Sequence, residues 1–190
     1  MTRTKELLEE FGREAAGTRR LLELVPQKHL AWKPHEKSMS IGRLAGHVAE
    51  IPGWAVTMTE CDELDLAAGP FYQPFEPASL RGLLVEFGSR VSDFNGALLA
   101  ARDADLDVTW TLRRGDRVIA ALTRGLALRQ LVLNHLVHHR GQLSVYLRLL
   151  EVSLPQVYGP TADHAEFTVV ESESRRTSGR MLFEELAYAL

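Results

Sequence analysis

Three histidines, at positions 47, 135 and 139, are the side chains in this sequence best suited to chemistry. His135 and His139 are separated by one turn of a helix, so both imidazole rings lie on one side of it. Two rings placed in this way can reach one point beside the helix, as a divalent metal ion requires of two of its ligands. The same spacing also suits two hydrogen-bonded histidines in a protein core, so the pair alone leaves both interpretations open.

A long helix must position this pair. Residues 123–151 contain no proline, are rich in leucine and arginine, and carry three of the seven histidines of the chain. Leucine and valine occupy much of the circumference of this helix, which is typical of a helix in the centre of a bundle. At about 100° per residue, one narrow stripe along it consists of Leu128, Leu131, His135, His139, Gln142 and Tyr146.

The polar neighbours of the pair are expected to have lesser roles. His138 lies off the stripe and should flank the site rather than form part of it. Gln142 and Tyr146 follow the pair on the same stripe, where they are candidates to orient its rings or to form hydrogen bonds within the bundle. We expect Arg140 to be a solvated residue at the rim, because arginine commonly extends along apolar neighbours to place its charge in water.

A second helix, beginning near Ser40, supplies the third histidine. Serine is a favourable N-cap, and the apolar residues that follow recur at helical spacing with His47 on the same inward face. Pro52 predicts a kink one turn beyond His47, and Glu50 is expected at the surface. An inward-facing histidine needs a polar partner, so His47 is either a metal ligand or a satisfied core histidine.

The rest of the chain completes an all-α prediction, a four-helix bundle. Further helices are expected over residues 2–24 and 78–103, with a long crossover at 61–77 after the second helix. Residues 108–112 and 117–120 are predicted to form a small β-hairpin before the fourth helix, with the Arg-Gly-Asp between them as its turn. Residues 1–170 should form the bundle domain, and residues 171–190 a polar segment followed by a short C-terminal helix.

The composition disfavours several classes of protein. The chain has 190 residues, a net charge of −3 and 25% charged residues, without the basic patch expected of a nucleic-acid partner. No uninterrupted apolar run is long enough to span a membrane, and the charged N-terminus does not resemble a signal peptide. The single cysteine, Cys61, excludes an intrachain disulfide and fits a cytoplasmic protein.

These residues together resemble the DinB/YfiT-like superfamily of metal-binding four-helix bundles. The resemblance rests on GRLAGHVAEIPGW in the second helix, entered through PHEKSMSIGRLAGH, on HLVHHRGQL in the fourth, and on LPQVYGPTAD after it. These motifs occur in the same order as in the family and extend over residues 1 to about 170. The tail beyond that point lies outside the usual family pattern.

The resemblance implies that His47, His135 and His139 together bind a divalent ion, most often zinc or nickel, and that the bundle forms a homodimer. Characterised relatives include S-transferases and isomerases that use low-molecular-weight thiols, so a metal-dependent thiol transferase is the leading expectation. Two alternatives remain open at this point: a hydrolase that uses a metal-bound hydroxide, and a non-catalytic, metal-stabilised module that binds a stress-related ligand. No HExxH arrangement is present, which disfavours zinc-protease chemistry. No side chain is assigned as catalytic.

Overall fold

The computed structural model describes residues 1–69 and 73–165. The chain divides into two compact units, Met1–Pro155 and Gln156–Leu190. In the second unit the described residues contain one isolated bridge, between Thr161 and His164, and Gln156 donates a hydrogen bond from its side-chain amide to the His164 carbonyl oxygen at 3.0 Å. The predicted C-terminal segment and helix, 171–190, lie outside the described residues.

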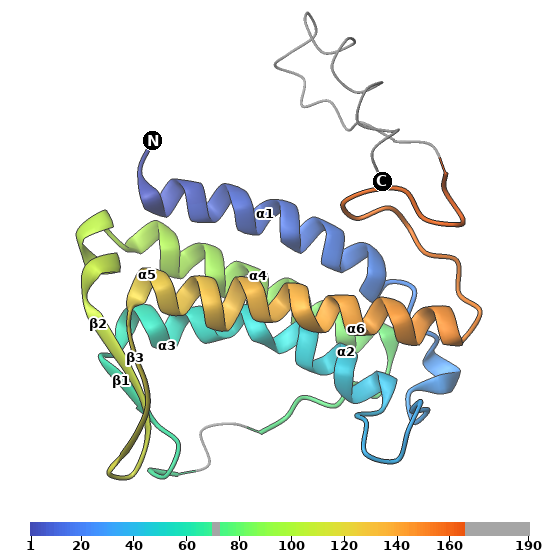
Figure 1. The fold of residues 1–190 in the computed structure, drawn as a ribbon, viewed down its shortest axis with the longest axis horizontal. Helices are drawn as coiled ribbons and strands as arrows, with labels where there is room; N and C mark the ends of the chain where they lie inside the picture. Colours follow the sequence, from blue (N-terminus) through green and yellow to red (C-terminus); the bar gives the residue numbers. More distant parts are fainter. Residues whose placement is uncertain (70–72, 166–190) are drawn as a thin grey trace, which may run out of the picture. The chain divides into compact units, whose positions relative to one another are not determined.

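The first unit contains the predicted four-helix bundle (Figure 1). Its first and third helices are α1 (Arg3–Leu22) and α4 (Leu80–Ala100). The second consists of α2 (Ile41–Glu50), the 3-10 turn η2 (Ile51–Gly53) and α3 (Trp54–Glu60), and the fourth of α5 (Arg124–Ala127), η4 (Leu128–Asn134) and α6 (His135–Leu149). Both α1 and α2 pack against α4 and α6. None of the described helices has the length and apolar character needed to cross a bilayer.

Hydroxyl side chains fix where these helices begin. Thr2, Ser40, Ser79 and Thr123 each accept a hydrogen bond from a backbone N–H in the first turn of the helix that follows, which satisfies a donor that the helix itself leaves unpaired. Apolar residues on the inward faces then bury a common core, in which the rings of Phe11 and Phe94 stack with centroids 3.7 Å apart. The core holds α2 and α6, the two histidine-bearing helices, next to each other.

Two irregularities lie close to the histidines. The predicted kink at Pro52 is confirmed, because η2 interrupts the second helix directly after Glu50. The fourth helix contains a π-helical segment, Leu128–Asn134, immediately before His135. The sequence did not predict this segment, which inserts wider turns into an otherwise regular helix. Such segments occur frequently at functional sites.

A small three-stranded sheet forms at one end of the bundle (Figure 1). The predicted hairpin is present as β2 (Thr109–Arg114) and β3 (Arg117–Thr123), which pair antiparallel. Gly115 occupies the turn with a φ of 56°, a left-handed conformation that favours glycine. The additional strand β1 (Glu63–Asp65) pairs parallel with β2. It lies within the segment expected to be an irregular crossover, and it anchors that crossover to the hairpin.

Candidate metal centre

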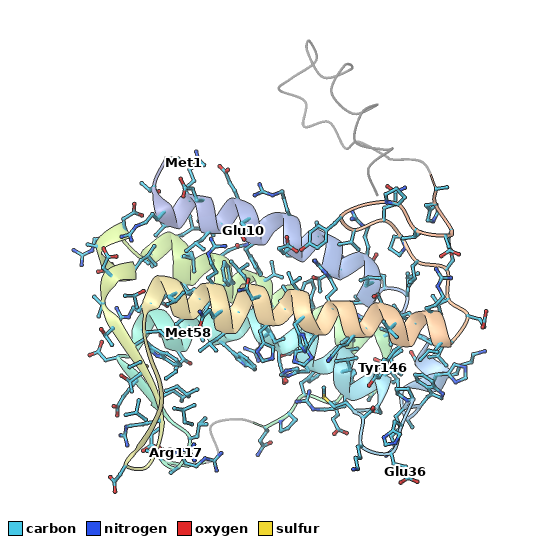
Figure 2. The ribbon with its side chains drawn as sticks, viewed as in Figure 1. Met1, Glu10, Glu36, Met58, Arg117 and Tyr146 are labelled. Atoms are coloured by element: carbon cyan, nitrogen blue, oxygen red, sulfur yellow. The ribbon has the colours of Figure 1, made fainter. Side chains whose placement is uncertain are left out.

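The structure brings together the three histidines that the sequence singled out. His47 extends from α2, and His135 and His139 extend from α6, into the space between these two helices, which Figure 2 shows filled with side chains. Ring nitrogens of the three residues all lie within 4.8 Å of one another. The imidazole centroids are 4.6 Å apart for two of the pairs and 5.2 Å apart for His47 and His135. The three side chains are half-buried.

The hydrogen bonds of His47 define how its ring is protonated. Its Nδ1 lies 2.8 Å from the Oε1 atom of Glu50. An ionised carboxylate can only accept hydrogen bonds, so Nδ1 of His47 donates to Glu50, and in the neutral ring Nε2 is then the acceptor. That Nε2 atom faces the Nε2 of His135 at 3.1 Å. The ring of His47 is therefore oriented with its free acceptor toward the other histidines.

A second acceptor orients His139 in the same way. Its Nδ1 lies 2.7 Å from the side-chain oxygen of Gln142, whose amide nitrogen lies 3.1 Å from Nε2 of His138. With the amide oxygen accepting and the amide nitrogen donating, His139 carries its proton on Nδ1 and leaves Nε2 for the centre of the cluster. This contact is the one that the predicted orienting role of Gln142 requires. His138 is exposed and lies outside the three-histidine cluster, as predicted.

Glu50 is the principal residue that the sequence analysis misplaced. It was expected at the surface, but it is only 6% exposed. Besides His47, Oε1 of Glu50 accepts hydrogen bonds from both terminal nitrogens of Arg43 at 3.1 Å, and Oε2 accepts one from the backbone N–H of Phe75 at 2.9 Å. The i, i+3 spacing from His47 to Glu50 was the signal that could have identified it, because residues three apart are neighbours on a helix.

Aromatic rings restrict the histidines from the remaining sides. Trp54, at the start of α3, packs edge-on against His135 with centroids 5.2 Å apart and lies 5.6 Å from the ring of His47. Trp54 follows η2 directly and lies about two helical turns after His47, on the same side of the second helix. Tyr146, predicted as a possible orienting group, instead meets the ring of Trp32 edge-on at 5.7 Å.

Burial favours the neutral form of two of the three histidines, His135 and His139. Burial, together with the positive charge that His139, His47 and His138 would carry when protonated, lowers the pKa of His135 from its ordinary value to about 4. Burial also lowers the pKa of His139, against the opposing effect of the hydrogen bond to Gln142. Metal binding requires unprotonated imidazoles, so these two side chains are in the correct state at neutral pH.

A second misplaced residue, Arg140, follows His139 directly. It was expected to be solvated, but it is 2% exposed. Its guanidinium forms an ion pair of 2.7 Å with Glu14 on α1 and donates hydrogen bonds to the Glu14 carbonyl and the Thr18 hydroxyl. Arg140 therefore joins α6 to α1 and belongs to the packing of the bundle, on a different side of α6 from the cluster.

A cavity of about 450 Å³ lies at the beginning of α2, the helix that carries His47. None of the three histidines lines it. Arg43 does line it, and Arg43 also contacts Glu50 and is close enough to His139 for its charge to contribute to the lowered pKa of that residue. The other polar lining residues are Lys33, Ser38, Ser40 and Glu76. The cavity offers space for a small polar molecule, and Arg43 connects its lining to the cluster through Glu50.

The residues present fit a divalent metal ion. Two of the three imidazoles have Nδ1 occupied by a protein acceptor, which directs Nε2 inward, and His135 presents its own Nε2 to the same region. Imidazole nitrogen suits zinc, nickel and related ions, and a histidine ligand almost always donates its second ring N–H to a carboxylate, carbonyl or water. No other group of histidine, cysteine and acidic side chains in the described parts of the chain converges in this way.

Fold and cluster together define a class of protein: a four-helix bundle with a small sheet and a three-histidine cluster between its second and fourth helices. The chain belongs to the DinB family, whose family profile matches residues 1–176. This confirms the resemblance inferred from the sequence motifs.

Solved structures of similar proteins agree with this assignment. A DinB-like protein from Bacillus cereus is 20% identical with a TM-score of 0.62, over 81% of this chain and 97% of that one. The DinB-like protein YjoA from Bacillus subtilis is 24% identical with a TM-score of 0.61, over 85% and 99%. A member of the family from Exiguobacterium sibiricum is 19% identical with a TM-score of 0.58, over 82% and 97%. Identities this low show a shared fold. A search of the curated proteins gave no match.

Proposed function

We propose that the chain binds one divalent ion, zinc or nickel, through His47, His135 and His139, and acts as a metal-dependent transferase for a low-molecular-weight thiol. The observation that carries this proposal is the convergence of three imidazoles, with no carboxylate or thiolate among the converging atoms. Neutral ligands leave a divalent ion its full charge, and three ligands leave positions open for substrate. When bound, such an ion lowers the pKa of a coordinated thiol.

The residues of the chain would prepare the site rather than take part in bond formation. Glu50 and Gln142 hold two of the rings in the tautomer that binds metal. Trp54 packs edge-on against His135 and restricts that ring from one side. The cavity beside Arg43 has room for the body of a small thiol compound, and its cationic and hydroxyl side chains suit polar substituents.

The proposed reaction is a substitution. The thiol loses its proton to solvent, and its sulfur donates an electron pair to an electrophilic carbon of the second substrate. A carbon–sulfur bond forms while the bond from that carbon to its leaving group breaks, and the leaving group departs with the bonding electrons. No oxidant or reductant is required, and the products are a thioether and the released anion.

Glu50 favours the transferase over the alternative of hydrolysis. A metal-dependent hydrolase uses a nearby base to handle the proton of the attacking water. Glu50 is the acidic residue in contact with the cluster, but it bonds to Nδ1 of His47, on the side of the ring away from the converging Nε2 atoms, and it is also occupied by Arg43 and Phe75. Hydrolysis would then depend on the ion alone to deprotonate water, whereas a thiol, with an ordinary pKa of about 8.5, needs a much smaller shift to become the nucleophile.

Metal content and thiol transfer test this proposal together. Untagged protein purified without a nickel column should contain about one divalent ion per chain by elemental analysis. The loaded protein should accelerate the loss of a small thiol in the presence of a chromogenic aryl chloride. The His135→Ala variant should lack both properties, and His138→Ala should keep them. Ester hydrolysis without thiol transfer would favour the hydrolase, and bound metal without either reaction would favour a binding module.

A further inference from the structure

Glu50 occupies a position between the three-histidine cluster and the crossover that follows α3. Its carboxylate is buried and accepts hydrogen bonds from a histidine ring, an arginine and a backbone amide. These donors come from different parts of the chain: His47 and Arg43 from α2, and Phe75 from the crossover. A buried carboxylate with so many donors is held in one geometry, and it holds its donors in return.

We infer that Glu50 is a positioning residue, which fixes His47 for metal binding and ties residues 73–77 of the crossover to the same helix turn. The inference rests on the proposed metal binding and concerns a residue outside the ligand set. Two consequences of the geometry support it, one for the histidine ring and one for the crossover.

The first consequence is a single tautomer and orientation for His47. Because Glu50 accepts from Nδ1 at 2.8 Å, the proton of the ring is held on that atom, and Nε2 remains available toward His135 and His139. Without the carboxylate, the ring could place its proton on either nitrogen and rotate about its side-chain bonds. Carboxylates that accept from a ligating histidine fix its orientation and raise its basicity, and their loss commonly weakens metal binding.

The second consequence is that the crossover lies directly against the turn that bears His47. The N–H of Phe75 donates to Oε2 of Glu50 at 2.9 Å. The Phe75 carbonyl oxygen approaches Gly46 so closely that a Cβ atom there would overlap it. Glycine at position 46 permits this approach, and Glu50 supplies the hydrogen bond that maintains it. Metal binding at His47 and the order of the crossover at Phe75 are therefore coupled through one carboxylate.

Zinc binding by the full-length chain tests the first consequence. Dissociation constants for Zn²⁺ would be measured by competition with a chelator for the native chain, Glu50→Ala, Glu50→Gln and Glu86→Gln. Glu86 is the matched control, because its carboxylate is also partly buried and paired with an arginine, Arg90, at 2.7 Å but has no hydrogen bond to a histidine. We expect Glu50→Ala to bind Zn²⁺ about 10–100-fold more weakly, Glu50→Gln to lie between it and the native chain, and Glu86→Gln to match the native chain.

Amide hydrogen exchange at Phe75 tests the second consequence and needs no catalytic activity. Exchange at this amide should be faster in Glu50→Ala than in the native chain, and Zn²⁺ should slow it in the native chain but not in the variant. Exchange within α4 should stay unchanged, which separates a local effect from general loss of stability. In cobalt-loaded protein, the visible absorption bands should shift in the variant, because His47 is no longer held in one orientation.

The outcomes distinguish this inference from the proposed function. A native chain that binds no zinc would overturn the proposed function. Zinc binding of equal strength in the native chain and Glu50→Ala would overturn only the positioning role. If Glu50→Ala does not fold, Glu50→Gln decides the question: weaker zinc binding with faster Phe75 exchange supports the inference, and unchanged values for both contradict it.

Discussion

His139 and Arg140 are consecutive on α6 but belong to two polar clusters with opposite properties. Arg140 is directed to α1, where one terminal nitrogen of its guanidinium meets the Glu14 carboxylate, the Glu14 carbonyl and the Thr18 hydroxyl. His139 is directed to α2, where its ring approaches His47 and His135. In the first cluster a cation meets an anion, whereas in the second three imidazole rings face one another.

The difference shows which buried polar groups indicate a function. In the Arg140 cluster opposite charges meet, so the interaction is complete within the protein and serves to join two helices. In the histidine cluster the outer nitrogens of two rings are occupied by Glu50 and Gln142, while the inner nitrogens, all potential acceptors, point toward one another. Acceptors that converge on one point are stabilised by a shared cation. The proposed function therefore rests on the histidine cluster and not on the Arg140 cluster.

The largest expected effect comes from removing a converging nitrogen. His139→Ala should abolish stoichiometric zinc binding, because two histidines cannot form the three-ligand site, while the metal-free chain should remain folded. His138→Ala is the matched control, since it removes a neighbouring imidazole that lies outside the cluster. Isothermal titration with Zn²⁺ and circular dichroism would measure the two properties. Equal loss of zinc binding in both variants would refute the ligand assignment.

Arg140→Ala should lower the stability of the fold and leave zinc binding intact. It leaves the Glu14 carboxylate, which is only 14% exposed, without its cationic partner. Breaking a buried ion pair by removing one partner costs about 3–5 kcal/mol, so the free energy of unfolding in urea should fall by roughly that amount. The fraction that remains folded should still bind zinc.

A double variant tests whether the loss of stability in Arg140→Ala comes from the unpaired Glu14 charge. Replacing both Arg140 with Met and Glu14 with Leu removes both charges, and such apolar replacements are often neutral or stabilising. The double variant should therefore be more stable than Arg140→Ala alone. If it is equally unstable, the contribution of Arg140 is packing rather than charge pairing.

Acid should weaken the metal-free protein through the histidine cluster. An imidazole in the unfolded chain takes up a proton near pH 6.5, whereas the pKa of His135 in the folded chain is about 4. Between these values the unfolded state binds more protons, so the free energy of unfolding falls as the pH falls from about 6.5 toward 4. Urea unfolding at about pH 7 and pH 5 would measure this. His135→Gln should show a smaller decrease than the native chain, and an equal decrease would contradict the assigned pKa.

The sequence predicted much of this arrangement because the decisive patterns are local. The i, i+4 spacing of His135 and His139, the Ser40 cap and the kink at Pro52 each depend on residues within one or two helical turns. Their meeting with His47 depends on tertiary packing, and the family resemblance supplied that information. The homodimer, the identity of the metal and the reaction stay predictions.

What the sequence missed depends on contacts with distant segments. Glu50 and Arg140 resemble ordinary surface residues of amphipathic helices, and only the approach of Phe75 and Glu14, respectively, buries them. Strand β1 was missed because three residues form too short a pattern, and it exists only through pairing with β2. The π-helical segment before His135 contains no proline or glycine, so no residue in it indicated an irregular helix.

The smallest expected effect is on zinc affinity, and it comes from Gln142 rather than from Glu50, the other acceptor that contacts a histidine ring of the cluster. Gln142→Leu removes the acceptor of His139 Nδ1, but Gln142 is neutral and exposed, whereas Glu50 is charged and buried. A neutral hydrogen bond contributes about 0.5–1.5 kcal/mol, so zinc affinity should fall by a factor of about 2–10.

The hydrogen bond between Gln142 and His139 also favours the protonated ring, since it raises the pKa of His139 against the effect of burial. Proton and metal affinity should therefore fall together in Gln142→Leu, measured by NMR titration of the ring and by zinc competition. A variant that loses metal affinity while the pKa of His139 stays constant would contradict the role of Gln142 as the acceptor for that ring.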